Sequence, residues 1–293
     1  MTRIYGIFAV LTTPFFDDGR IDYEGMAGNV DWLIRQGIHG VVPLGSTGEF
    51  ASLSDQQKET AMQTVIQAAD GRIPVMVGTS AETTEKAIEY ASVAQKHNAD
   101  GILLLPPWYY TPSAEEVVFH YKAVSDAVDI PIMIYNNPWS SKVDIQAETV
   151  CQLAQLKNVT HIKESTGDIR RITEIRTLTS DQLTIFCGWE DLAYESLVMG
   201  AKGWICVAAN FAPKICVELF EAIVEKKDLE AGWVLYKRLL PALRYLEKGG
   251  KMHQTVKYAL DQLGLCGGES SHPRLPLNDT EREAVRALLD DLE

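Results

Sequence analysis

Short, nearly continuous apolar runs recur about every 20 to 33 residues along most of this chain, and this repeat limits the folds open to it more than any other feature. Runs of this kind are typical of strands that are buried on both faces of a parallel sheet. Eight strands are predicted in this way: Ile7–Leu11, Val41–Leu44, Pro74–Gly78, Ile102–Leu105, Ile132–Tyr135, His161–Glu164, Thr184–Cys187 and Trp204–Val207.

Amphipathic segments separate these runs and predict helices at Gly25–Gln36, Gln56–Ala69, Thr84–His97, Glu115–Val128 and Ala147–Leu156. Two of them begin with a capping-box pattern, Ser54 with Gln57 and Ser113 with Glu116. Eight βα units in series form either a closed barrel or an open doubly wound sheet. The open sheet usually carries G-x-G-x-x-G after its first strand, and here that turn is absent. We therefore predict an α/β protein with a (β/α)8 TIM barrel.

Beyond residue 227 the pattern becomes purely helical, with segments at Leu229–Leu246, Met252–Leu263 and Thr280–Leu292. The predicted organisation is a barrel over residues 1–227 and a three-helix extension, packed on the barrel, over residues 228–293. A chain that is 46% apolar can bury a core of this size.

Charge and cysteine content narrow the possible partners and the compartment. The net charge is −13, which disfavours binding to nucleic acid. The five cysteines are odd in number and contain no C-x-x-C pair, which favours a reducing, cytoplasmic location over a disulfide framework or a zinc site. The six histidines show no metal-ligand spacing, and no run of 18 apolar residues could span a membrane.

In such a barrel the chemistry lies at the carboxyl ends of the strands. Gly45-Ser46-Thr47-Gly48-Glu49 follows the second strand, where backbone N–H groups and hydroxyls can bind an anion, although a plain tight turn fits equally well. Tyr135-Asn136-Asn137-Pro138 ends the fifth strand, where a buried tyrosine with a hydrogen-bond partner is the simpler interpretation.

Lys163, near the end of the sixth strand, is the most informative residue. Alternation places it on the same side of the strand as His161, inside a packed barrel. Lysines are rarely buried without a partner or a function, and desolvation favours the neutral amine, which attacks carbonyl groups. The structural alternative is a salt bridge with Glu164. Together with a carboxylate-binding turn and a tyrosine that moves protons, Lys163 predicts Schiff-base chemistry on a 2-oxo acid.

Three motifs, Gly45–Glu49, Tyr135–Pro138 and Lys163–Asp168, together with Gly203 through Pro213, resemble the dihydrodipicolinate synthase and N-acetylneuraminate lyase family of class I Schiff-base aldolases. The resemblance covers nearly the whole chain. It implies a (β/α)8 barrel, a metal-free and cofactor-free lyase that forms a covalent lysine imine, and a homotetramer built as a dimer of dimers.

The resemblance also implies roles for individual residues. Lys163 would form the imine, Tyr135 would transfer protons, Thr47 would relay them, and Tyr109 would complete the relay in a neighbouring subunit's site. The substrate-binding residues would be Ser46, Thr47, Gly48, Asn137, Ser140, Gly188, Glu190 and Ile205.

Ser140 departs from part of that family. Synthases that condense pyruvate with aspartate semialdehyde carry an arginine there, which grips the carboxylate of the second substrate, and serine cannot supply this charged contact. We therefore expect a catabolic aldolase, dehydratase or deaminase acting on a small 2-oxo acid or cyclic imino acid, such as a keto-deoxy sugar acid or pyrroline-4-hydroxy-2-carboxylate. The alternatives are 4-hydroxy-tetrahydrodipicolinate synthase and a non-catalytic barrel that binds 2-oxo acids.

Overall fold

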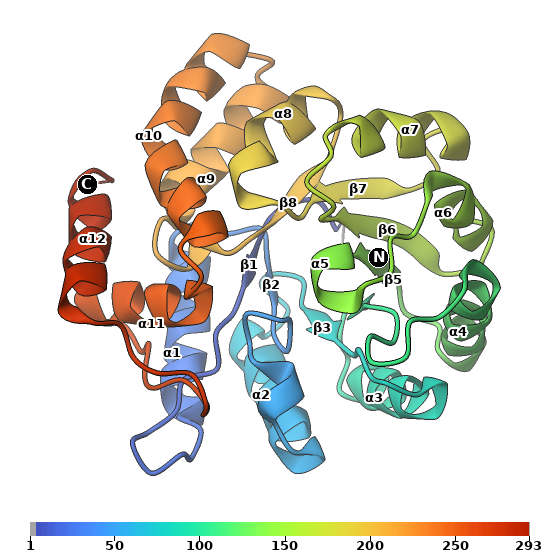
Figure 1. Ribbon diagram of the computed structural model, residues 1–293, viewed down its shortest axis with the longest axis horizontal. Helices are drawn as coiled ribbons and strands as arrows, with labels where there is room; N and C mark the ends of the chain where they lie inside the picture. Colours follow the sequence, from blue (N-terminus) through green and yellow to red (C-terminus); the bar gives the residue numbers. More distant parts are fainter. Residues whose placement is uncertain (1–3, 293) are drawn as a thin grey trace.

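The computed structural model describes residues 4–292 and shows parallel strands around a central axis, with helices on the outside (Figure 1). The strands follow the order β2-β1-β8-β7-β6-β5-β4-β3, and a parallel bridge between Val41 and Val75 joins the two ends. The predicted (β/α)8 barrel is therefore confirmed. The strands are β1 Gly6–Val10, β2 Gly40–Val42, β3 Met76–Gly78, β4 Gly101–Leu104, β5 Ile132–Asn136, β6 Val159–Glu164, β7 Thr184–Cys187 and β8 Gly203–Cys206.

Helices follow the strands around the barrel. They are α1 Tyr23–Arg35, α2 Asp55–Ala69, α3 Thr84–Lys96, α4 Ala114–Ala127, α5 Pro138–Ser141, α6 Ala147–Leu153, α7 Arg170–Thr179, α8 Ala193–Val198 and α9 Pro213–Phe220. Both predicted capping boxes are formed, at Ser54 with Gln57 and at Ser113 with Glu116. Within residues 4–292, no helix is long and apolar enough to cross a bilayer.

Three further helices lie beyond the barrel repeat: α10 Leu229–Lys248, α11 Met252–Gln262 and α12 Asp279–Asp290. Figure 1 shows α11 crossing α1, with α12 next to α11, and the Asn29 amide of α1 donates to the Cys266 carbonyl after α11 (2.7 Å). Leu243, Val256 and Val285 of these helices belong to the same buried cluster as the barrel strands. Helices of the predicted extension thus share the barrel's core, while the division at residue 227 stays a prediction.

Aromatic rings fill the middle of the barrel. The rings of Phe8 and Phe186 meet edge to face at 5.5 Å. A Cβ atom on Gly40 or on Gly203 would lie 2.3 Å from one of these rings, so the strands need glycine at both positions. The interior below the carboxyl ends of the strands is therefore solid, and a ligand can be held only above it.

Candidate active site

A cleft of about 560 Å³ opens at the carboxyl ends of the strands. The structure brings to it every predicted site residue except Gly48 and Tyr109. The predicted residues that line it are Ser46, Thr47, Tyr135, Asn137, Ser140, Lys163, Gly188, Glu190 and Ile205. Trp139 and Trp189 also line the cleft.

Lys163 lies near the carboxyl end of β6 and is only 6% exposed. In the described part of the chain, no carboxylate lies within 4.0 Å of its Nζ atom, so the alternative salt bridge with Glu164 does not form. Alternation turns Glu164 away, and its carboxylate accepts from the Asn136 amide (3.0 Å) and the Thr166 N–H (2.7 Å). The amine thus faces the cleft, without a counter-charge in direct contact.

Tyr135 on β5 is paired in register with Lys163, and its ring centroid lies 4.1 Å from the lysine Nζ. The Asn137 amide donates to the phenol oxygen (2.9 Å). Burial alone would raise the pKa of Tyr135, but the Lys163 charge and hydrogen bonds with Asn137, Lys163 and Ser46 outweigh burial and lower it. A phenol with a lowered pKa gives up its proton more readily, as proton transfer requires.

His161, one pleat below Lys163, behaves as a core residue. Its Nε2 atom lies 3.3 Å from the Ile4 carbonyl, and burial lowers its pKa to about 4. It is therefore neutral near pH 7 and supplies no charge to the cleft.

The turn after β2 brings Ser46 and Thr47 to the cleft, beside Tyr135. Gly48 lies behind them, where its carbonyl accepts from the Thr13 hydroxyl (2.7 Å), so it does not line the cleft. Within this turn, Ser46 is the residue that helps to lower the pKa of Tyr135, while the expected relay through Thr47 stays a prediction.

Gly188 follows β7 and packs directly against the lysine. A Cβ atom there would lie 2.0 Å from the Ser165 Oγ and 2.7 Å from the Lys163 Cγ. The Ser165 hydroxyl donates to the Gly188 carbonyl (2.9 Å). Because no side chain occupies this position, the β7 backbone can hold the stem of Lys163 in place.

The distal wall comes mainly from α5. Asn137 caps this short helix by accepting the Ser140 N–H (3.2 Å). The Trp139 indole donates to the Thr166 carbonyl (3.1 Å), and its ring lies 6.0 Å from that of Trp189. The two tryptophans narrow this end of the cleft.

Glu190 is 2% exposed rather than lying in an open loop. Its carboxylate accepts the N–H groups of Val207 (2.8 Å) and Ala208 (3.1 Å), and its own N–H donates to the Glu247 carboxylate (2.7 Å). Burial, with a smaller effect of the Glu247 charge, raises the pKa of Glu190 to about 7. Burial also raises the pKa of Glu247. Two carboxyl groups with raised pKa values therefore line the wall beside Lys163, and Glu190 is the one that binds its proton up to about pH 7.

Tyr109 is 73% exposed and lies outside the cleft. Its N–H donates to the Glu82 carboxylate (3.1 Å), and its ring meets that of Tyr110 edge to face at 5.0 Å. A single chain therefore does not bring Tyr109 to Tyr135, and the expected role in a neighbouring site stays a prediction.

The sequence analysis missed the residues that the C-terminal helices contribute. These are Leu246, Glu247, Gly250, Met252 and His253, at the end of α10 and the start of α11. The periodicity of a helical segment does not indicate which of its residues will lie over the cleft of a barrel. The adjacent glycines Gly249 and Gly250, which end α10, were the one available hint of a turn there.

Within residues 4–292, no three side chains of His, Cys, Asp or Glu are grouped as metal ligands would be. The predicted absence of a metal and of a cofactor stays a prediction.

The fold and the cleft define a class: a (β/α)8 barrel with a buried lysine and a tyrosine at the carboxyl ends of adjacent strands. Comparison with known proteins gives the family. The sequence profile of the Dihydrodipicolinate synthetase family matches residues 3–292. The chain belongs to this family, as its motifs indicated, and is an enzyme of that family.

The relatives are similar along their whole length. The chain is 35% identical over 287 residues to a 4-hydroxy-tetrahydrodipicolinate synthase of Bartonella bacilliformis, covering 97% of this chain and 96% of that one. A candidate dihydrodipicolinate synthetase from Pseudomonas aeruginosa has a TM-score of 0.97 at 35% identity, covering 99% of this chain and 100% of that one. A chloride-inhibited dihydrodipicolinate synthase from Acinetobacter baumannii, complexed with pyruvate, has a TM-score of 0.91 at 32% identity and 98% coverage of both chains.

Proposed function

We propose that this protein is a lyase that forms a Schiff base between Lys163 and a small 2-oxo acid. The observation that carries the proposal is the buried Lys163 amine, 4.1 Å from the Tyr135 ring centroid, in a cleft that a hydroxyl-bearing turn also lines. A buried amine in an accessible cleft is what attack on a carbonyl requires.

Each residue has a step in this scheme. The substrate carboxylate binds the turn at Ser46 and Thr47, which directs the ketone carbon at the Lys163 nitrogen. The unprotonated amine adds to the carbonyl, the oxygen takes up a proton, and loss of water from the carbinolamine gives the imine. Tyr135 carries these protons, and its lowered pKa suits it to both directions of transfer.

The distal wall indicates the substrate class. It presents the Ser140 hydroxyl, and the wall beside Lys163 carries the carboxyl groups of Glu190 and Glu247. The basic side chains among the described lining residues are those of Lys163 and His253. Such a wall suits hydroxyl groups better than a second carboxylate. We therefore propose a catabolic aldolase, dehydratase or deaminase for a keto-deoxy sugar acid or pyrroline-4-hydroxy-2-carboxylate.

The second candidate is 4-hydroxy-tetrahydrodipicolinate synthase. The names of the relatives at about 35% identity favour it, and the Acinetobacter baumannii relative is complexed with pyruvate. The absence of a guanidinium at Ser140 argues against it, because the carboxylate of aspartate semialdehyde would then face Glu190 and Glu247.

The assembly and setting proposed are a cytoplasmic homotetramer that needs no metal or cofactor. The exposed rings of Tyr109 and Tyr110 suit contact with another subunit. A monomeric dihydrodipicolinate synthase variant is among the structures that this chain resembles (TM-score 0.93), so the fold alone does not dictate the assembly. Light scattering would measure it.

Trapping tests the central step. Incubation with pyruvate, reduction with borohydride and peptide mass spectrometry should place the adduct on the peptide that holds Lys163. Binding of 2-oxo acids without any adduct would instead support the non-catalytic barrel. Parallel assays with keto-deoxy sugar acids, pyrroline-4-hydroxy-2-carboxylate, and pyruvate plus aspartate semialdehyde would then identify the reaction; efficient condensation of the last pair would overturn the catabolic proposal.

A further inference from the structure

One face of α11 contacts both ends of the turn that carries Ser46 and Thr47. His253 donates from Nε2 to the Ser46 carbonyl (2.9 Å), and Lys257 forms an ion pair with Glu49 (2.6 Å). His253 and Lys257 are four residues apart, so they lie one above the other on the helix. We call these two contacts the α11 clamp.

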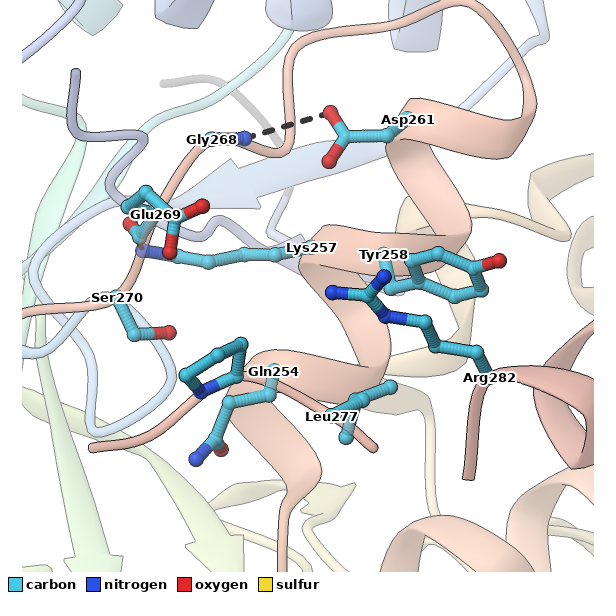
Figure 2. A pocket seen from close by; sticks show the side chains of 10 residues that line it. Gln254, Lys257, Tyr258, Asp261, Gly268, Glu269, Ser270, Leu277 and Arg282 are labelled. Carbon is cyan, nitrogen blue, oxygen red and sulfur yellow. Dashed lines mark hydrogen bonds between the residues drawn. The ribbon is translucent and has the colours of Figure 1, made fainter. Parts of the chain in front are cut away.

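The lysine end of the clamp is buried. The Lys257 side chain is 2% exposed, and its ammonium also donates to the backbone carbonyls of Thr13 (2.7 Å) and Glu269. Figure 2 shows Lys257 leaving α11 and reaching toward the backbone at Glu269. Its hydrogen bonds are therefore directed at fixed backbone groups, which leaves the ammonium little freedom to move.

The glutamate end is held as firmly. The Glu49 side chain is fully buried, and its second oxygen accepts the Ser271 N–H (2.9 Å), the Ser271 hydroxyl (2.6 Å) and an Arg274 N–H (3.2 Å). Burial alone would raise the pKa of Glu49, but the Lys257 charge and the Ser271 bonds lower it, so the carboxylate stays ionised. Glu49 also has φ of 56°, a left-handed conformation that is uncommon for residues other than glycine.

Stability alone does not explain this arrangement. A buried ion pair gains little over well-packed apolar side chains, because both charges lose their hydration. The pair does fix the position of the turn that carries Ser46 and Thr47. Glu49 follows Thr47 by two residues and cannot move without moving that turn. The Thr13 hydroxyl donates to the Gly48 carbonyl (2.7 Å), which holds the middle of the same turn in place.

We infer that Lys257, together with His253, is a positioning residue that holds Ser46 and Thr47 in the geometry that binds the substrate carboxylate. The inference rests on the proposed Schiff-base function. The C-terminal helices thus hold the far side of the substrate-binding turn, in addition to lining the cleft.

The test compares two ketones in borohydride trapping, pyruvate and methyl pyruvate, which lacks the carboxylate charge. The variants are Lys257→Met, Glu49→Gln and the double variant, which leaves no unpaired buried charge. Lys251→Met is the matched control, since it removes another Lys–Glu ion pair at α11 whose partner, Glu281 (2.7 Å), belongs to α12 and not to the turn. His253→Leu removes the other half of the clamp without burying a charge, and it carries the test if the Glu49 and Lys257 variants fail to fold.

We expect the half-saturating concentration of pyruvate to rise about ten- to hundredfold in the folded clamp variants. In the clamp variants, the half-saturating concentration of methyl pyruvate should stay close to that of the wild type. In Lys251→Met, the half-saturating concentrations of both ketones should stay close to those of the wild type. An equal change for both ketones, or no change for pyruvate, would overturn the positioning role. If the wild type forms no adduct with pyruvate, the proposed function fails instead, and calorimetric titration of pyruvate into the same variants then decides on the clamp alone.

Discussion

The Nζ atom of Lys163 lies 4.1 Å from the ring centroid of Tyr135, and the two residues are direct partners on the adjacent strands β6 and β5. The barrel thus places the proposed nucleophile and the proposed proton carrier at the same height by backbone register. Neither depends on a loop for its position.

Replacing Tyr135 with phenylalanine keeps the ring and removes the hydroxyl. We expect imine formation with pyruvate to slow by about 10² to 10⁴, the usual loss when a general acid–base group is removed. Single-turnover trapping measures the rate. Tyr194→Phe is a control, because its hydroxyl donates to the Leu229 carbonyl (3.0 Å) and the residue does not line the cleft. A Tyr135→Phe variant as fast as wild type would exclude proton transfer by this phenol.

Replacing Lys163 with methionine should abolish the adduct while leaving the circular dichroism spectrum unchanged. It should also raise the pKa of Tyr135, because the lysine charge is the largest influence that lowers it. Ultraviolet difference titration of the Lys163→Met variant against a Lys163→Met/Tyr135→Phe variant isolates this tyrosine. An adduct that persists in Lys163→Met would place the imine on another residue.

Replacing Gly188 with alanine would put a methyl group 2.7 Å from the Lys163 Cγ and 2.0 Å from the Ser165 Oγ. We expect trapping to slow by about ten- to hundredfold, because the lysine stem must move. The matched control is Gly28→Ala on α1, where an added Cβ meets nothing within 4 Å. In that control the rate of adduct trapping should equal the wild-type rate. Its free energy of unfolding should rise by about 0.5–1 kcal/mol, because alanine is a better helix former than glycine.

Protonation of Glu190 should appear in the pH dependence of stability. Its pKa is about 7 when folded and near 4.5 when unfolded, so the folded state binds the extra proton in between. The stability that this proton contributes is present below about pH 4.5 and is lost as the pH rises to about 7, a change of about 3 kcal/mol. Urea unfolding across this range should show the loss in wild type, relative to Glu190→Gln. Parallel profiles for the two proteins would contradict the raised pKa.

Replacing Ser140 with arginine would place a guanidinium on the distal wall. We expect condensation of pyruvate with aspartate semialdehyde to rise at least about tenfold, since a bidentate charge pair replaces a hydroxyl. Turnover of a hydroxylated substrate should fall. Lys142→Arg is the control, since residue 142 is exposed and lies outside the cleft lining. Wild-type condensation that already matches Ser140→Arg would show that the serine does not exclude this substrate.

Much of the fold could be predicted because the barrel repeats one local pattern. The strand Thr184–Cys187 is predicted to the residue, and the starts of α3, α6, α10 and α11 agree as well. Strand ends elsewhere differ by a residue or two, as at β1, because apolar runs continue past the last ladder hydrogen bond. Alternation also placed Lys163 and His161 on one side of β6 correctly.

The sequence by itself determined the eight βα units, the buried side of β6 and the motifs at the strand ends, because each depends on local periodicity. Only the tertiary structure decided that Glu190 is buried against Val207 and Ala208, and that Glu247 lies beside it. It also decided that Lys257 pairs with Glu49, more than two hundred residues away in sequence. Contacts between distant segments depend on how helices pack around the closed barrel, and no local pattern records that geometry.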